Sequence, residues 1–161
     1  WQPIFFVPEK AHQVWGPSLE EGRAKRDASL GPLEVYLQAS FAVTDDDHLA
    51  QQMLDGMRPM IALYVGGMGA KGKNFYNDVA RAYGYEEEAE KIQDLYLSGK
   101  KREAEALVPT EWLEAANLVG PASYVKERLA AFEAAGVTDL NVIPATADPT
   151  ATIGQLKELI G

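Results

Sequence analysis

The amino-acid sequence predicts an α/β fold assembled from parallel β-α units. Two segments, residues 33–43 and 138–144, are rich in β-forming residues, and the first lacks the wide polar face of a surface helix. Each is followed by a stretch with helical periodicity, and a further helix with a Gly120-Pro121 start and a Gly136 stop precedes the second. Strands that alternate with helices in this way imply parallel crossovers, either in a doubly wound sheet or in a closed barrel.

The N-terminal segment begins with the apolar run WQPIFFVP, residues 1–8, which fits the end of a buried strand and the loop after it. A proline in the middle of a helix removes a backbone hydrogen bond and clashes with the preceding turn. Pro17 would occupy that position in a helix over residues 9–26. We therefore expect the helix to run from about Pro17 to Arg26, with Pro17 in its first turn.

The segment LEVYLQASFAV, residues 33–43, is expected to be a mostly buried strand, and TDDD at residues 44–47 to cap the next helix. Apolar residues at spacings of three and four then mark one face of a helix that runs to about Val65, with a kink or break at Pro59. That face consists of Leu49, Met53, Met57, Met60 and Tyr64.

A helical insert is predicted over about residues 66–118, between the strands at 33–43 and 138–144. A last helix is expected from about Thr150 to Ile160. Three strands cannot close a barrel, so in a barrel most of the strands would lie upstream of Trp1. Residues 1–161 are thus predicted to form a single domain or a partial barrel.

Composition excludes several classes of function. The absence of cysteine rules out disulfides and Cys-ligated metals, and two histidines without partners at ligand spacing predict no metal site. A net charge of −9 with only short basic groups argues against nucleic acid. No apolar run is long enough to cross a bilayer, so we expect a cytoplasmic protein with no membrane contact. Because the chain opens on Trp1 without a methionine, we expect it to be a piece of a longer one.

The string GGMGAKGKN, residues 66–74, has the G-x-x-x-x-G-K spacing of a phosphate-binding loop. Two observations argue against that assignment. Position 74 is Asn where such a loop needs a hydroxyl for Mg²⁺, and the residues before the loop continue a helical stripe rather than a strand. A glycine-rich connector between helices is one alternative. The other is a mobile lid in which Lys71, Lys73 and Asn74 meet an anionic part of a substrate.

Longer strings resemble a known family. WQPIFFVPEKA, LEVYLQASFAVTDDD, the insert ALYVGGMGAKGKNFYNDVARAYGYEEEAEKI and above all LVGPASYVKERLAAFEAAGVTDLNVIP are similar to the C-terminal part of the bacterial-luciferase-like flavin oxidoreductases. Within these, the closest resemblance is to the branch that uses the deazaflavin coenzyme F420. The resemblance covers nearly the whole chain.

This resemblance implies the C-terminal portion of a (β/α)₈ TIM barrel, about three βα units plus the helical insert, with the missing N-terminal half supplied upstream. It implies hydride transfer between F420 and a small-molecule organic substrate at the C-terminal mouth of the strands, in a homo-oligomeric enzyme. Trp1 would sit at the end of the sixth strand, and the catalytic residues would lie upstream of it. The residues expected to line the pocket are Trp1, Pro3, Phe5, Thr44, Pro144 and Ala145.

Two alternatives remain open at the level of the sequence. One is an FMN-dependent monooxygenase of the same family, in which FMN replaces F420 as the cofactor. The other is a non-catalytic α/β interaction module, whose open strand edges would join copies of itself or a partner chain. A nucleotide-binding switch at the glycine loop is a third and more distant option.

Overall fold

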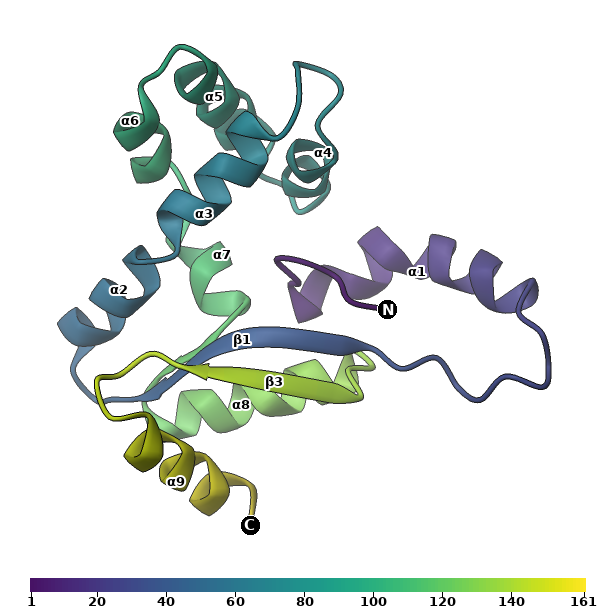
Figure 1. Ribbon diagram of the computed structural model, residues 1–161, viewed down its shortest axis with the longest axis vertical. Helices are drawn as coiled ribbons and strands as arrows, with labels where there is room; N and C mark the ends of the chain where they lie inside the picture. The colour runs from purple at the N-terminus through teal and green to yellow at the C-terminus, as the bar shows by residue number, and fades with distance from the viewer. The chain divides into compact units, whose positions relative to one another are not determined.

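A computed structural model describes residues 1–161, which form two compact units: Trp1–Gln51 with Glu114–Gly161, and Gln52–Leu113. The first contains a sheet and the second is helical, as the ribbon in Figure 1 shows. The elements of the sheet unit are α1 (Pro8–Ala24), β1 (Tyr36–Val43), β2 (Leu118–Gly120), α8 (Ala122–Ala134), β3 (Asp139–Pro144) and α9 (Pro149–Ile160). The helical unit contains α3 (Arg58–Ala62), η1 (Leu63–Gly67), α4 (Phe75–Ala82), α5 (Glu86–Leu97) and α6 (Lys101–Ala106), while α2 (Asp47–Asp55) and α7 (Thr110–Ala115) span the two boundaries.

The sheet has the strand order β2-β1-β3, and both pairings are parallel. Phe41 is opposite Leu118 on one side of β1 and opposite Pro144 on the other. The prediction of an α/β fold with parallel strands is therefore confirmed, and both long strands fall within the predicted ranges. The strand β2 was not predicted, because its three residues follow a helical pattern and pair only with a distant segment.

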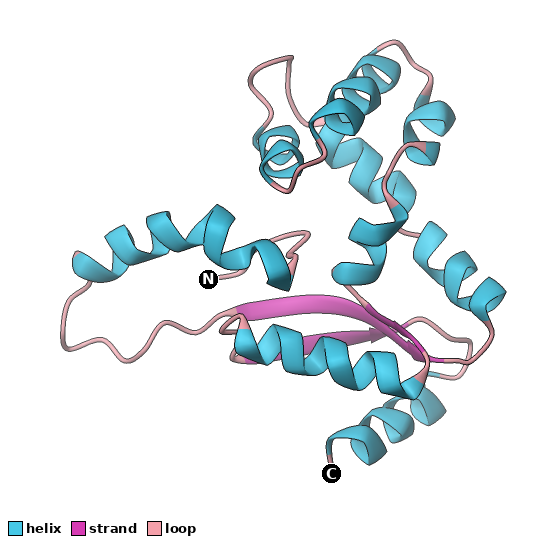
Figure 2. Ribbon diagram, turned by 180° about the vertical axis from the view of Figure 1, so that it is seen from behind, coloured by secondary structure: helices cyan, strands magenta, loops and turns pink.

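One face of the sheet carries the apolar core. Leu37, Ala39 and Phe41 are buried there, beside Val125 and Phe132 of α8. Leu156 and Leu159 of α9 pack against the same cluster. Figure 2 shows α8 lying along the strands. Burial of these side chains holds α8 and α9 on this face of the sheet.

The opposite face of β1 and β3 is polar and carries no such layer. Its cross-strand neighbours are Tyr36 with Asp139, Gln38 with Asn141, and Ser40 with Ile143. All of these side chains are exposed except that of Ser40, which is half-buried. The sheet therefore exposes this second face from Tyr36 to Gln38, whereas Ala42, near the end of β1 on the same face, is buried.

Helix α1 is longer than the sequence predicts. We expected it to begin near Pro17, but it begins at Pro8 and passes through Pro17 without a break. Pro8 occupies the first turn, where a missing N–H costs nothing. Pro17 is exposed, as is Gln13 one turn earlier, so water can hydrate the carbonyl that lacks its helical donor. Residues 1–7, expected to contain a strand end, have no regular secondary structure.

The helical unit confirms that residues 58–67 are helical rather than a strand. The break in the preceding helix falls at Gly56-Met57, just before the predicted position at Pro59, so that Pro59 lies in the first turn of α3.

Trp112 is fully buried in this unit, where its ring stacks on Tyr85 at 5.5 Å and meets Tyr83 edge to face at 5.7 Å. No helix in the chain combines the length and apolarity needed to cross a bilayer.

Candidate functional site

The C-terminal ends of the three parallel strands lie together at one edge of the sheet unit. The backbone N–H of Thr44 donates to the carbonyl of Gly120 at 3.0 Å, and that of Ala145 donates to the carbonyl of Phe41 at 2.9 Å. Thr44 and Ala145 therefore continue the ladders on the two sides of β1. The structure thus brings together three of the predicted pocket residues: Thr44, Pro144 and Ala145.

Local hydrogen bonds fix the loops at this edge. The hydroxyl of Thr44 accepts from the N–H of Asp46 at 3.1 Å, and Asp46 caps α2 by accepting from Leu49 at 3.0 Å. Asp148 caps α9 by accepting from Ala151 at 3.0 Å. Both loops after β1 and β3 therefore end in capped helix starts, and the cap that TDDD predicted for the helix after β1 is confirmed.

Trp1 lies at the other end of β1. Its backbone nitrogen donates to the carbonyl of Glu34 at 2.8 Å, and its carbonyl accepts from Tyr36 at 2.9 Å. Bonds to residues 34 and 36 are the pair that one residue of a neighbouring parallel strand makes. Trp1 therefore borders the start of β1, whereas Thr44 borders its end, and the structure does not bring these two predicted pocket residues together.

Pro3 and Phe5 lie between Trp1 and α1. Pro3 is buried, and Phe5 is half-buried with a left-handed backbone at φ 54°. This conformation is uncommon for a residue other than glycine and is found where the surrounding structure imposes it. Phe5 marks the point where the chain turns from the edge of β1 into α1.

On the edge of β1 that faces Trp1, one backbone N–H group between Trp1 and β2 is hydrogen-bonded by a side chain. The amide oxygen of Asn117, a buried residue, accepts from the backbone N–H of Ser40 at 2.9 Å. Asn117 was not predicted to have a role, because the residues around it follow a helical pattern. No neighbouring residue indicates that Asn117 bonds to Ser40, which lies 77 positions away in the sequence.

Within the helical unit, Asn74 is a structural residue. Its side-chain oxygen accepts from the N–H groups of Tyr76 and Asn77, which caps α4. Its side-chain nitrogen donates to the carbonyls of Tyr64 and Val65, both at 2.9 Å. Asn74 is 2% exposed, and four hydrogen bonds use its whole capacity. It therefore closes the loop at residues 68–73 onto η1, and no capacity is left for a ligand.

Three glycines at this loop serve packing. A Cβ on Gly66 or on Gly67 would lie 2.5 Å from an atom of Tyr96, and a Cβ on Gly69 would lie 2.5 Å from the carbonyl oxygen of Lys73. Lys71 is ion-paired with Asp94, and Lys73 is exposed. Of the two glycines in the phosphate-loop spacing, Gly67 packs against Tyr96, whereas Gly72 has a left-handed backbone at φ 71° and open space around it. No strand precedes the loop.

One buried charge was also missed by the sequence analysis. Arg128 of α8 is 6% exposed, and its guanidinium binds both carboxylate oxygens of Glu9 and the carbonyl of Ala115. The hydrogen bond from Arg128 lowers the pKa of Glu9 below its ordinary value. Burial raises the pKa of the nearby Tyr124 hydroxyl. Arg128 connects α1, α8 and the chain before β2.

Comparison with known proteins agrees with this architecture. The family model of the luciferase-like monooxygenases matches residues 1–139. The chain belongs to the luciferase-like monooxygenase family. A relative from Mycobacterium tuberculosis, named as a coenzyme F420-dependent oxidoreductase, is 36% identical to this luciferase-like chain over 158 residues.

Two solved structures share the fold. The coenzyme F420-dependent tetrahydromethanopterin reductase of Methanopyrus kandleri has a TM-score of 0.60 at 24% identity, with 96% of this chain and 41% of that chain covered. An F420-dependent secondary alcohol dehydrogenase, solved with an F420-acetone adduct, has a TM-score of 0.64 at 17% identity, with 98% and 41% covered. The alignment with the mycobacterial relative spans 97% of this luciferase-like chain and 44% of the relative. The chain therefore spans less than half the length of the proteins it matches.

Proposed function

We propose that this luciferase-like chain is the C-terminal portion of a (β/α)₈ barrel enzyme that transfers a hydride between coenzyme F420 and an organic substrate. The observation that carries the proposal is the 36% identity, over nearly the whole chain, to a protein named as an F420-dependent oxidoreductase. About three βα units and the helical unit would come from this chain. The rest of the barrel would come from residues outside it.

The sheet supports this proposal in two ways. Within the sheet unit, α8 and α9 pack on one face, while Gln38 and Asn141 lie on the opposite face, which would be turned toward the barrel interior. The backbone of Trp1 makes the hydrogen bonds of a further parallel strand beside β1. A three-stranded sheet that has neighbours on both edges in the whole protein would continue into a closed barrel.

The residues at the strand ends fit one wall of a deazaflavin site. Ile143 exposes 44% of its surface on the polar face, and Pro144 and Ala145 follow it at the end of β3. These apolar groups offer a surface to a planar ring, while the amide of Asn141, two residues before Ile143 on the same face of β3, offers a donor and an acceptor to its polar edge. When bound, the coenzyme supplies the hydride chemistry. The role of this wall is to orient the ring and exclude water.

Of the remaining residues predicted to line the pocket, some belong to the proposed cofactor wall and others do not. Pro3 and Phe5 would continue the wall beside β1, and Thr44 would border it after β1. The ring of Trp1 packs against Phe6 and Trp15, so we leave it out of the cofactor wall. Asn74 is also left out, because its hydrogen bonds are all used within the helical unit.

The test is purification of the intact protein from a host that makes F420. We expect the coenzyme to copurify with the protein and to be reduced or oxidised in the presence of an alcohol, aldehyde or sugar-phosphate substrate. An intact protein that retains no F420 and turns over none of these substrates contradicts the proposal. The description of the matching family as monooxygenases favours FMN as a second candidate cofactor. The absorption spectrum of the bound cofactor distinguishes the two.

We also propose that Lys71 and Lys73 contact an anionic group of the substrate. The double replacement Lys71→Ala/Lys73→Ala is expected to raise the KM for substrate several-fold and to leave the Kd for the coenzyme within two-fold. An unchanged KM for substrate would contradict this role and leave the loop as a connector between helices. A matched control is Lys100→Ala, an exposed lysine of the same unit that pairs only with Glu103. A cytoplasmic location and a homo-oligomeric state complete the proposal, and light scattering of the intact protein tests the second.

A further inference from the structure

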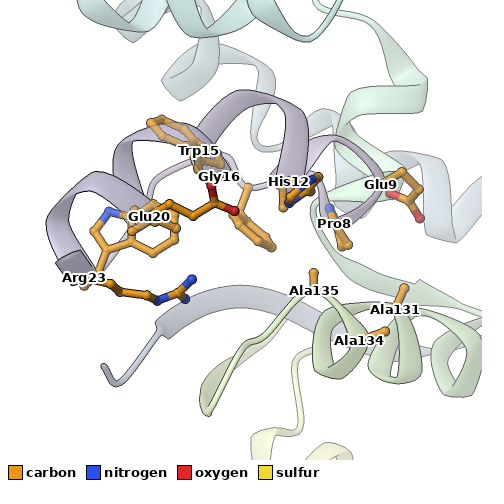
Figure 3. A pocket seen from close by; sticks show the side chains of 14 residues that line it. Pro8, Glu9, His12, Trp15, Gly16, Glu20, Arg23, Ala131, Ala134 and Ala135 are labelled. Atoms are coloured by element: carbon orange, nitrogen blue, oxygen red, sulfur yellow. The ribbon is translucent and has the colours of Figure 1, made fainter. Parts of the chain in front are cut away.

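A cavity of about 530 Å³ lies in the sheet unit between α1 and α8, at a place that the proposed oxidoreductase does not use. Figure 3 shows it from close by, with α1 on one side and, on the other, Ala131 and Ala134 of α8 and Ala135 directly after it. Because α8 contributes only these small side chains, space remains between the two helices. Its apolar lining includes the rings of Trp1, Phe6 and Trp15 on one side and the three alanines on the other.

Three aromatic rings of this lining are held in place before any ligand arrives. The ring of Trp1 meets that of Trp15 at 5.6 Å and 65°, and that of Phe6 at 6.3 Å and 78°. Phe6 is buried and packs in turn against Phe132 in the core at 6.5 Å. Edge-to-face contacts of this kind fix the orientation of each ring. The aromatic wall is therefore preorganised, which lowers the cost of binding a flat apolar molecule.

The polar groups at the cavity include one free acid and one free base. Glu20 and Arg23 both line the cavity from α1, and Figure 3 shows their side chains extending from the helix over it. Neither takes part in any ion pair of the structure. Glu9 also lines the cavity, but its carboxylate is held by Arg128. A ligand therefore meets one available carboxylate and one available guanidinium.

His12 lines the cavity beside Gly16. A Cβ at position 16 would lie 3.1 Å from Nδ1 of His12, so the imidazole rests against Gly16. The glycine costs helix stability relative to alanine. Its position inside α1 is explained by the space that it gives to this ring.

We propose that this cavity binds a small, uncharged, planar heteroaromatic molecule that carries a hydrogen-bond donor and an acceptor on one edge. The aromatic wall takes the ring system. Glu20 accepts from the N–H of the ligand, and Arg23, one turn further along the same helix face, donates to its carbonyl. One acid and one base favour a neutral ligand over an ion of either sign. The volume is within the range of small-molecule pockets and accommodates a bicyclic ring.

The experiment is a calorimetric and ligand-observed NMR titration of the intact protein with 2-quinolone, a bicyclic ring with adjacent N–H and C=O groups. Quinoline, the same ring system without that pair, is the comparison ligand. We expect saturable binding of 2-quinolone in the micromolar to millimolar range and binding of quinoline that is weaker by about five-fold or more. Glu20→Ala/Arg23→Ala is expected to remove this difference.

The decisive variant is Ala134→Leu, which fills the cavity from an exposed helix position where leucine is well tolerated. It is expected to weaken 2-quinolone binding at least ten-fold, with an unchanged circular dichroism spectrum and unfolding midpoint. Ala122→Leu, at an exposed position on the same helix outside the cavity, is expected to leave binding within two-fold.

Three results would overturn the proposal: no saturable binding, equal binding by wild type and Ala134→Leu, or equal loss in the Ala122→Leu control. Equal affinity for the two ligands would overturn the assigned roles of Glu20 and Arg23. None of these results depends on whether the protein uses F420.

Discussion

Replacement of Asn74 by aspartate should destabilise the helical unit, although aspartate caps helices as well as asparagine does. In Asn74→Asp one carboxylate oxygen can still accept from Tyr76 and Asn77. The other oxygen takes the place of a nitrogen that donates to two carbonyls, each at 2.9 Å. Two hydrogen bonds are lost, and an anion is placed against two carbonyl oxygens in a site that is 2% exposed.

The size of the effect follows from these contacts. Loss of a hydrogen bond to a buried group costs about 1–3 kcal/mol. Val65 keeps a second donor, the side chain of Asn77 at 3.1 Å, so its carbonyl is not left without a hydrogen bond. We expect a loss of about 2–4 kcal/mol for either variant: Asn74→Asp keeps the cap but adds a buried anion, and Asn74→Ala adds no charge but loses a cap worth about 1 kcal/mol.

Urea unfolding, together with amide hydrogen exchange at Tyr76 and Asn77, measures both variants. The matched control is Asp148→Asn, because Asp148 caps α9 through its oxygen and the structure shows no bond that needs an amide nitrogen there. The control should change stability by less than about 0.5 kcal/mol. If Asn74→Asp unfolds at the same urea concentration as wild type, the structural role of Asn74 is wrong and its place in a ligand-binding lid is open again.

Three further predictions concern the sheet unit. Glu9→Gln should lower the free energy of unfolding by about 1–2 kcal/mol at neutral pH, which is less than for a fully buried ion pair because Glu9 is half-exposed. Arg128 lowers the pKa of Glu9, so the ion pair stabilises the fold above the ordinary glutamate pKa and stops doing so as the pH falls through the lowered pKa. The unfolding curves of wild type and variant should therefore converge in acid. Gly120→Ala should cost about 1–3 kcal/mol in thermal unfolding, because φ is 147° and a Cβ would lie 3.1 Å from Tyr124. Gly22→Ala, with nothing within 4 Å, should instead gain about 0.5–1 kcal/mol, and a loss there would contradict the helical assignment.

Sequence reasoning succeeded where the signal is local. The strands β1 and β3 were found from β-forming residues, and α8 from Gly120-Pro121 at its start and Gly136 at its end. The helical periodicity of residues 58–65 correctly predicted a helix before the glycine loop, although the spacing of the glycines and lysines that follow matches a phosphate-binding loop, which needs a strand there. Each of these features depends on residues a few positions apart, which fix periodicity and capping without the rest of the chain.

The remaining features depend on contacts that the sequence does not display. Pro17 was read as a helix start, because the solvation that lets a helix continue through proline depends on which face is exposed. Asn74 was assigned to a lid, because its partners Tyr64 and Val65 are found only when η1 packs against α4. The pairing of Arg128 with Glu9 joins residues 119 positions apart. Of the candidate site, sequence reasoning found Thr44, Pro144 and Ala145 at strand ends but could not place Trp1 at the opposite end of β1.

The hydrogen bonds from Thr44 to Gly120 and from Ser40 to Asn117 mean that the chain leaves and rejoins the sheet on adjacent strands. Parallel neighbours are about 5 Å apart, and the entropy of closing the intervening stretch grows only with the logarithm of its length. The stretch can therefore be lengthened, shortened or exchanged at little cost to the ladder between β1 and β2. A circular permutation or a domain insertion in this stretch should therefore leave the β1–β2 ladder intact, so the sheet unit sets few limits on what lies between its first two strands.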